Sequence, residues 1–135
     1  MTQVSSPAPV VRIEDLRVAA STDSGREVEI IRGVTLDLAQ GEMLALIGES
    51  GSGKTTIALS LLGYARPGCH FSGGRVLVEG RDVLAQTEAE RRRLRGRVVS
   101  YVPQSAAAAF NPSKSIIEQV IEVAEIHGLM DRAAA

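Results

Sequence analysis

Eight consecutive residues have the types and spacing of a phosphate-binding loop. They fit the pattern G-x-x-x-x-G-K-[ST] at every fixed position and comprise Gly48, Glu49, Ser50, Gly51, Ser52, Gly53, Lys54 and Thr55. Backbone N–H groups turned inward by such a loop surround the oxygens of a polyphosphate with hydrogen-bond donors. The Lys54 ammonium adds a mobile positive charge, and the Thr55 hydroxyl is a typical Mg²⁺ ligand. The motif therefore predicts a site for a magnesium-bound polyphosphate.

The segments on either side of the loop are those that the motif requires. Residues 43–47 are a short continuous apolar run, which is typical of a central strand buried on both faces. Residues 57–63 have the composition of an apolar helix that stops at Gly63. An ordinary glycine-rich turn is the alternative reading of the loop. A strand before the loop and a helix after it argue against that alternative.

Composition excludes several other classes of protein. The net charge of −1 is not that of a nucleic-acid-binding domain, which is usually strongly basic. Cys69 is the only cysteine, so neither an internal disulfide nor a cysteine-based zinc site is expected. The longest apolar run is too short to cross a bilayer. Residues 1–9 are expected to be a flexible lead-in without the features of a secretory signal. These observations predict a cytoplasmic protein.

The rest of the chain contains signals for further strands and helices. Strands are expected at residues 10–18, 34–38, 75–79 and 98–102, with a polar turn between the first two. The stretch 71–74 (FSGG) is expected to be a turn. Capping boxes predict helices at residues 87–95 and 115–129. In the first of these helices, the run of arginines is interpreted as a solvated face. After the second, the residues MDRAAA carry no stop signal, so the sequence reads as cut within a helix.

Taken together, these motifs resemble the nucleotide-binding domain of ABC transporters. The loop is followed by Thr56 and by Leu-Leu-Gly at 61–63, as is typical of that family. Residues 95–104 resemble the strand that ends at the family's Q-loop glutamine, here Gln104. Phe-Asn-Pro at 110–112 resembles an element of the dipeptide, oligopeptide and nickel importer subfamily. The resemblance covers residues 10–127, nearly the whole chain.

The resemblance implies an α/β fold, a RecA-like P-loop NTPase core with an N-terminal antiparallel β portion. It divides the chain into the lead-in at 1–9, the N-terminal part of the ATP-binding domain at 10–112, and the start of a helical subdomain at 113–135. The helical subdomain is expected to be truncated before it is complete.

The resemblance also implies the ligands and their residues. The loop Gly48–Thr55 and Thr56 would bind ATP, Lys54 and Gln104 would be catalytic, and Thr55 and Gln104 would hold Mg²⁺. The expected partners are transmembrane permease subunits and a second ATP-binding subunit, with no nucleic acid. Through the permease, the protein would lie at the inner face of the cell membrane.

The implied function is that of an ATP-binding subunit that energises import of peptides or nickel. In the family, the signature motif, the Walker B carboxylates and the switch histidine come later than residue 135. A chain of these 135 residues is therefore expected to hydrolyse ATP very weakly or not at all. Two alternatives stay open: a non-catalytic nucleotide-binding remnant that acts through association, and another P-loop enzyme of the kinase type.

Overall fold

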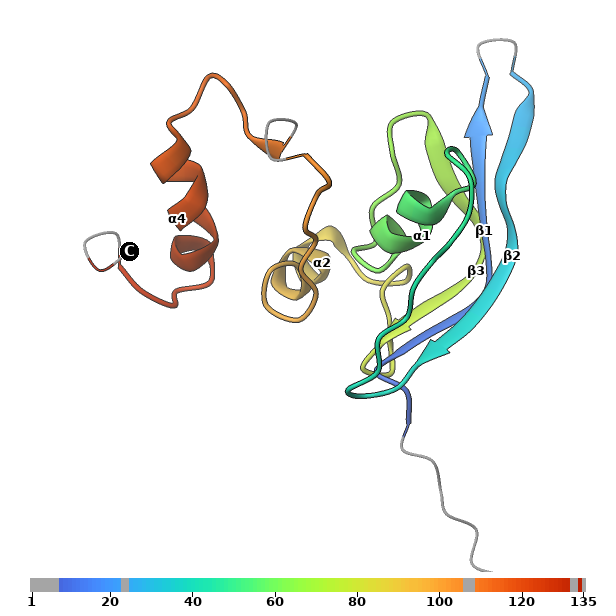
Figure 1. The fold of residues 1–135 in the computed structure, drawn as a ribbon, viewed down its shortest axis with the longest axis horizontal. Coiled ribbons are helices and arrows are strands. Elements are labelled where there is room, and N and C mark those ends of the chain that lie inside the picture. Colours follow the sequence, from blue (N-terminus) through green and yellow to red (C-terminus); the bar gives the residue numbers. More distant parts are fainter. Residues whose placement is uncertain (1–7, 23–24, 106–108, 132–133, 135) are drawn as a thin grey trace, which may run out of the picture. The chain divides into compact units, whose positions relative to one another are not determined.

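The computed structural model describes residues 8–22, 25–105, 109–131 and 134, which belong to two compact units (Figure 1). The first unit ends at Arg91 and the second begins at Arg92. The phosphate-binding loop lies in the first unit, and Gln104 lies in the second. The boundary expected between residues 112 and 113, and the lead-in at 1–9, stay predictions.

An antiparallel sheet of four strands forms most of the first unit. The strands are β1 (Val11–Ser21), β2 (Glu27–Leu38), β3 (Cys69–Val78) and β4 (Arg81–Asp82), in the order β2-β1-β3-β4. The polar turn expected between β1 and β2 is closed by Thr22, whose N–H donates to the Arg26 carbonyl at 2.9 Å. The predicted N-terminal antiparallel portion is therefore confirmed.

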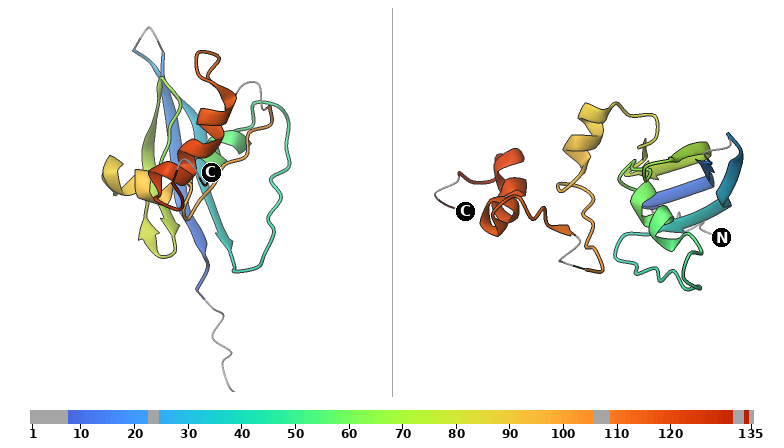
Figure 2. Two further views of the ribbon diagram at one scale, coloured as in Figure 1. Left: turned by 90° about the vertical axis from the view of Figure 1, so that its left-hand side faces the viewer. Right: turned by 90° about the horizontal axis from the view of Figure 1, so that it is seen from above.

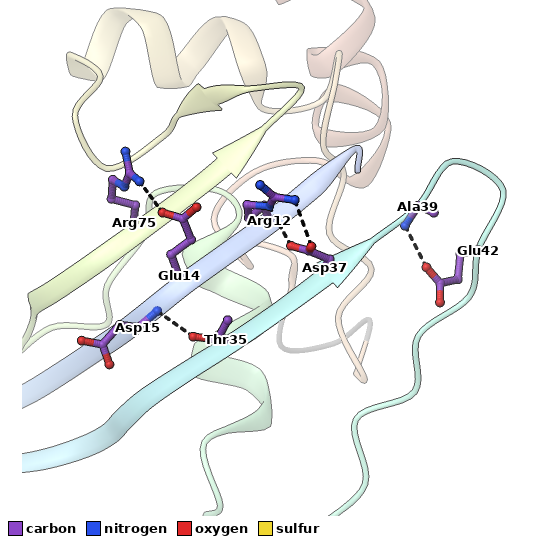
Figure 3. Close-up of polar contacts among 8 residues, drawn as sticks. All are labelled: Arg12, Glu14, Asp15, Thr35, Asp37, Ala39, Glu42 and Arg75. Carbon is purple, nitrogen blue, oxygen red and sulfur yellow. Dashed lines mark hydrogen bonds and ion pairs between the residues drawn. The ribbon is translucent and has the colours of Figure 1, made fainter. Parts of the chain in front are cut away.

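Polar cross-strand pairs fix the register on one face of the sheet (Figure 3). Arg12 on β1 lies opposite Asp37 on β2, and its guanidinium donates two hydrogen bonds to that carboxylate at 3.0 and 3.1 Å. Glu14 on β1 lies opposite Arg75 on β3 and forms an ion pair with it. Because Arg12 and Glu14 alternate with the buried Val11 and Ile13, the opposite face of β1 is left for apolar packing.

Close to Asp15, a bulge interrupts the ladder between β1 and β3. Asp15 has φ 46°, and Gly74 across the ladder has φ 85°. A Cβ on Gly74 would overlap backbone atoms of Glu14 and Asp15, so the two strands approach closely here. The stretch 71–74 was expected to be a turn, and this expectation is wrong because it continues β3 through the bulge.

The helix α1 (Lys54–Ser60) covers the apolar face of the sheet (Figures 1 and 2). Ile57 and Leu61 pack against a core of six buried residues, which are Val11, Ile13, Leu16, Val18, Ile31 and Val76. The turn that follows α1 ends at Gly63 (φ 60°), where the N–H of Tyr64 donates to the Leu59 carbonyl at 3.2 Å. This bond is typical of a glycine-terminated helix. The predicted stop at Gly63 is confirmed.

Residues 43–47 do not form the buried strand that their composition predicts. The segment has no regular secondary structure, and Met43 and Ile47 are 95% and 94% exposed. A central parallel strand needs a hydrogen-bonded neighbour on each edge and cover on both faces. The sheet of the described residues is antiparallel and offers this segment no such neighbour. The apolar run suggests a segment suited to a buried strand. Whether such a strand forms depends on neighbouring strands, which the local sequence does not specify.

The first of the two predicted capping boxes forms at helix α2 (Glu88–Leu94). The Glu90 carboxylate accepts from the Thr87 N–H at 2.7 Å, and the Glu90 N–H donates to the Thr87 hydroxyl at 3.4 Å. Each side chain therefore satisfies a backbone donor at the start of the helix. The position of this helix is confirmed.

One residue of the arginine run is not part of a solvated face. The Arg91 side chain is only 22% exposed, and its guanidinium donates to the carbonyls of Val83 at 3.1 Å and Leu84 at 2.8 Å. A Cβ on Gly63 would meet Arg91 Cδ at 2.8 Å, so Gly63 leaves room for this side chain. The expectation of a solvated face is wrong for Arg91, because the carbonyls of Val83 and Leu84 accept hydrogen bonds from its guanidinium.

Replacement of Arg91 by alanine is expected to lower the free energy of unfolding by about 2 kcal/mol, because charge-assisted hydrogen bonds to half-buried carbonyls are lost. Urea denaturation followed by circular dichroism measures the loss. The matched control is Arg93→Ala on the exposed side of the same helix, which should cost less than about 0.5 kcal/mol. Equal losses for the two variants would show that the hydrogen bonds of Arg91 contribute nothing.

The second unit contains α4 (Ile116–Ile126), whose N-cap Ser115 accepts from the Glu118 N–H at 3.4 Å. This confirms the predicted start of the helix. The predicted end at 129 is wrong, because Gly128 (φ 61°) terminates the helix and the Leu129 N–H donates to the Ala124 carbonyl at 3.0 Å.

Two apolar features of the second unit are exposed. Residues 98–102 were expected to form a strand, but in the structure only a single bridge joins Arg95 to Val99. On α4, Ile121 is 7% exposed, whereas Ile116, Ile117 and Val120 are each more than half exposed.

None of the helices in the described ranges has the length and apolar character that crossing a bilayer requires.

Candidate functional site

The phosphate-binding loop joins segment 43–47 to α1. Gly51 and Gly53 have φ 83° and 90°, backbone angles that residues other than glycine rarely adopt. A Cβ on Gly51 would meet no atom within 4 Å, so at this position glycine is required by the backbone angle alone. At Gly53, the N-cap of α1, both the backbone angle and the surrounding atoms exclude a side chain.

The Lys54 ammonium lies over this loop and is bound by it. Its Nζ donates to the carbonyl of Gly48 at 2.8 Å, to the carbonyl of Glu49 at 2.5 Å and to the hydroxyl of Ser52 at 3.2 Å. An ammonium has three donors, so the three acceptors of the loop satisfy all of them. The positive charge is thereby held against the loop.

Gly48 keeps the space beside the ammonium open. A Cβ at this position would meet Ser52 Oγ at 2.8 Å and would lie 4.0 Å from Lys54 Nζ. A side chain at residue 48 would therefore displace Ser52, one of the three acceptors of the Lys54 ammonium. This gives a steric reason for the first glycine of the motif.

Thr55 and Thr56 belong to the first turn of α1, and Thr55 is exposed. The described residues contain no group of three His, Cys, Asp or Glu side chains that could hold a metal ion by themselves. Mg²⁺ is usually held by one or two protein oxygens together with phosphate oxygens and water. A single exposed hydroxyl at Thr55 fits this kind of site, in which phosphate oxygens and water supply most of the metal ligands.

The other residues expected at the site differ in their placement. Glu49 and Ser50 are exposed members of the loop, and Glu49 contributes its carbonyl to Lys54. Gln104 is exposed in the second unit, so its approach to a nucleotide stays a prediction.

One residue that touches the loop was missed at the level of sequence. Ile31 of β2 is buried, and its Cδ1 occupies the place where a Cβ on Gly53 would lie. The two residues are 22 positions apart, and no local pattern relates them. Only the packing of α1 on the sheet brings them together.

Comparison with known proteins identifies the family. Residues 31–135 match the family model described as ABC transporter. The chain belongs to the ABC transporter family. The predicted resemblance is confirmed, and with it the fold class, which is the P-loop NTPase fold of the ABC ATPase domain.

Similar proteins include ATP-binding proteins of dipeptide and oligopeptide transport. The dipeptide transport ATP-binding protein DppD of Caldanaerobacter subterraneus subsp. tengcongensis is 34% identical over 120 residues, which are 89% of this chain and 36% of that protein. The oligopeptide transport ATP-binding protein OppD of Salmonella typhimurium is 35% identical over 135 residues, which are 99% of this chain and 40% of that protein. The chain thus spans less than half the length of these relatives.

A solved structure shows the same fold. A bacterial Atm1-family ABC exporter with ATP bound superposes with a TM-score of 0.52 at 26% sequence identity. The superposition covers 96% of this chain and 23% of the exporter chain. The fold of this ABC-family chain therefore corresponds to a minor part of the exporter chain.

Proposed function

We propose that this ABC-family chain carries the phosphate-binding part of an ATP-binding subunit that energises peptide import. The observation that carries the proposal is the Lys54 ammonium, bound by two carbonyls and one hydroxyl of a loop of the right sequence. A polyphosphate offers the ammonium stronger, charged acceptors than the neutral ones that it has in the structure. In the proposal, Lys54 exchanges these neutral acceptors for oxygens of the β- and γ-phosphates of ATP.

The other loop residues have complementary roles in the proposal. Backbone N–H groups of residues 51–56 donate to phosphate oxygens, helped by the backbone angles of Gly51 and Gly53. The Thr55 hydroxyl holds Mg²⁺, which when bound neutralises charge on the phosphates. Gln104 contacts Mg²⁺ and the attacking water, and it acts together with Lys54 as a catalytic residue. The role of Gln104 is supported by the family pattern alone.

The partners follow from the same family pattern. Transmembrane permease subunits and a second ATP-binding subunit would complete the transporter at the inner face of the cell membrane. The names of the relatives support peptides as the cargo, and nickel remains an alternative from the resemblance of residues 110–112. In the structure, this segment is an ordered turn before α4: the Gln119 side chain accepts from the Asn111 N–H at 2.7 Å and donates to the Asn111 carbonyl at 3.1 Å.

Isothermal titration calorimetry with Mg-ATP tests the proposed function. We expect one nucleotide bound per chain, with affinity that falls when EDTA removes Mg²⁺. Heat of binding that is indifferent to EDTA would contradict the role given to Thr55. No binding at millimolar Mg-ATP, in a sample whose circular dichroism shows a folded protein, would contradict nucleotide binding altogether.

Hydrolysis by these 135 residues alone is expected to be at least about 100-fold slower than by a complete peptide-importer subunit assayed in parallel, because in the family the carboxylate that polarises the attacking water comes later than residue 135. A coupled assay for released phosphate measures it. Turnover close to that of the complete subunit, and lost on Lys54→Ala, would contradict this expectation.

The exposed apolar segments favour a second candidate, a module that acts through association. Met43, Ile47 and Val102 are each at least 89% exposed, and apolar surface of this kind marks contact sites. Sedimentation equilibrium discriminates between the candidates. A stable oligomer that forms without nucleotide and is unaffected by Lys54→Ala would favour the association module over the ATP-binding subunit.

A further inference from the structure

One side chain of the sheet lies very close to Gly53 at the start of α1. A Cβ built on Gly53 would overlap Cδ1 of Ile31, whereas the Ile30 carbonyl oxygen and Ile31 Cγ1 would lie at ordinary distances of 3.7 and 3.8 Å. Ile31 Cδ1 therefore fills the space beneath Gly53. Glycine at this position permits close contact between the phosphate-binding loop and β2.

Ile31 is itself packed within the core of the first unit. It is 3% exposed, belongs to the core cluster, and lies opposite the fully buried Val18 in the ladder between β2 and β1. Packed interiors leave such a side chain little freedom to move. The height of Gly53 above the sheet is thereby set by the core.

Gly53 directly precedes the residues that would bind the ligand. Lys54 and Thr55 follow it, and its carbonyl accepts the first hydrogen bond of α1, from the Ile57 N–H at 2.9 Å. A shift of Gly53 would move the N–H groups and side chains of both residues. Binding sites tolerate displacements of about 0.5 Å before function suffers.

We propose that Ile31 is a positioning residue of the phosphate-binding loop: its Cδ1 supports Gly53 and so sets the position of Lys54 and Thr55 toward the nucleotide. Ile31 acts through Gly53 and does not itself touch the phosphates. The inference rests on the proposed nucleotide binding at this loop and adds a residue outside the motif to the site.

The variant Ile31→Val tests the inference because it removes Cδ1 and little else. The matched control is Ile13→Val, which removes the same group from an equally buried isoleucine of the same core. Both variants should lose similar stability. At a temperature where both are folded, Ile31→Val should weaken Mg-ATP binding by about fivefold, and Ile13→Val by less than about twofold. Equal effects on affinity would overturn the proposal.

A rescue experiment isolates the contact. Gly53→Ala introduces the overlap with Cδ1 and should abolish measurable Mg-ATP binding. In the Gly53→Ala/Ile31→Val double variant the new Cβ meets only ordinary contacts, so binding should return in part, limited by the backbone angle of residue 53. Gly53→Ala/Ile13→Val should show no return, because Ile13 does not relieve the overlap. Rescue by both substitutions or by neither would overturn the proposal.

Hydrogen exchange separates failure of this inference from failure of the proposed function. Without nucleotide, the amides of residues 53–57 should exchange faster in Ile31→Val than in Ile13→Val. If wild-type protein binds no Mg-ATP, the proposed function fails, and this comparison still decides the role of Ile31. Equal exchange in the two variants would overturn the inference even where wild-type protein binds nucleotide.

Discussion

Replacement of Lys54 by methionine is expected to weaken Mg-ATP binding by about 100-fold, or about 2.7 kcal/mol, because charge-assisted hydrogen bonds to phosphate are lost. Methionine keeps most of the aliphatic stem and removes the ammonium, so packing along the stem changes little. In the structure, the ammonium also links Gly48, Glu49 and Ser52, so the loop itself should become more mobile. Titration calorimetry measures the affinity.

Lys114 provides the matched control, because it is the only other lysine in the sequence. It is exposed and forms an ion pair with Glu122 at 3.6 Å on the second unit. Lys114→Met should change Mg-ATP affinity by less than about twofold, as expected for an exposed surface charge outside the loop motif. A similar loss of affinity in both variants would indicate general attraction of an anion by positive charge, and not a site at the loop.

The largest effect on stability is expected at Gly74, where replacement by alanine should lower the free energy of unfolding by about 3 kcal/mol. The added Cβ would overlap the backbone of Glu14 and Asp15, and backbone atoms within a ladder cannot rotate away as a flexible side chain can. The φ of 85° adds strain. Chemical denaturation measures the loss, and failure to fold would be the extreme form of the same outcome.

Gly80→Ala separates steric overlap from backbone strain. Gly80 has φ 75°, close to that of Gly74, but a Cβ there would meet no atom within 4 Å. This variant should lose only about 1 kcal/mol, the cost of a left-handed backbone angle. If Gly74→Ala lowered the free energy of unfolding no more than Gly80→Ala, the inferred close approach of β1 and β3 at the bulge would be contradicted.

These expectations differ in how far the sequence alone supports them. The loop, the N-caps at Thr87 and Ser115 and the stop at Gly63 depend on neighbouring residues, so local patterns predicted them. The stop at Gly128 was missed although glycine is itself a typical signal for the end of a helix. Residues beyond it, rich in alanine, favoured a longer helix. Here the backbone preference of one glycine outweighs the helix propensity of the residues that follow.

Features that depend on distant residues could not be predicted. The apolar run 43–47 indicates a buried strand, but burial requires partner strands that a local pattern does not specify. Gly74 resembled part of a turn because the bulge that requires it is formed by Asp15, far away in the sequence. In the same way, Ile31 contributes to the site only because α1 packs on β2.

Amide hydrogen exchange of folded wild-type protein, with and without Mg-ATP, tests the central claim most directly. The claim is that the backbone of residues 48–56, Lys54 and Thr55 surround a magnesium-bound triphosphate. Exchange should slow at the amides of residues 51–56 when Mg-ATP is added, while the amides of β4 and α4 should be unchanged. Unaltered exchange in residues 51–56 at millimolar Mg-ATP would contradict the claim.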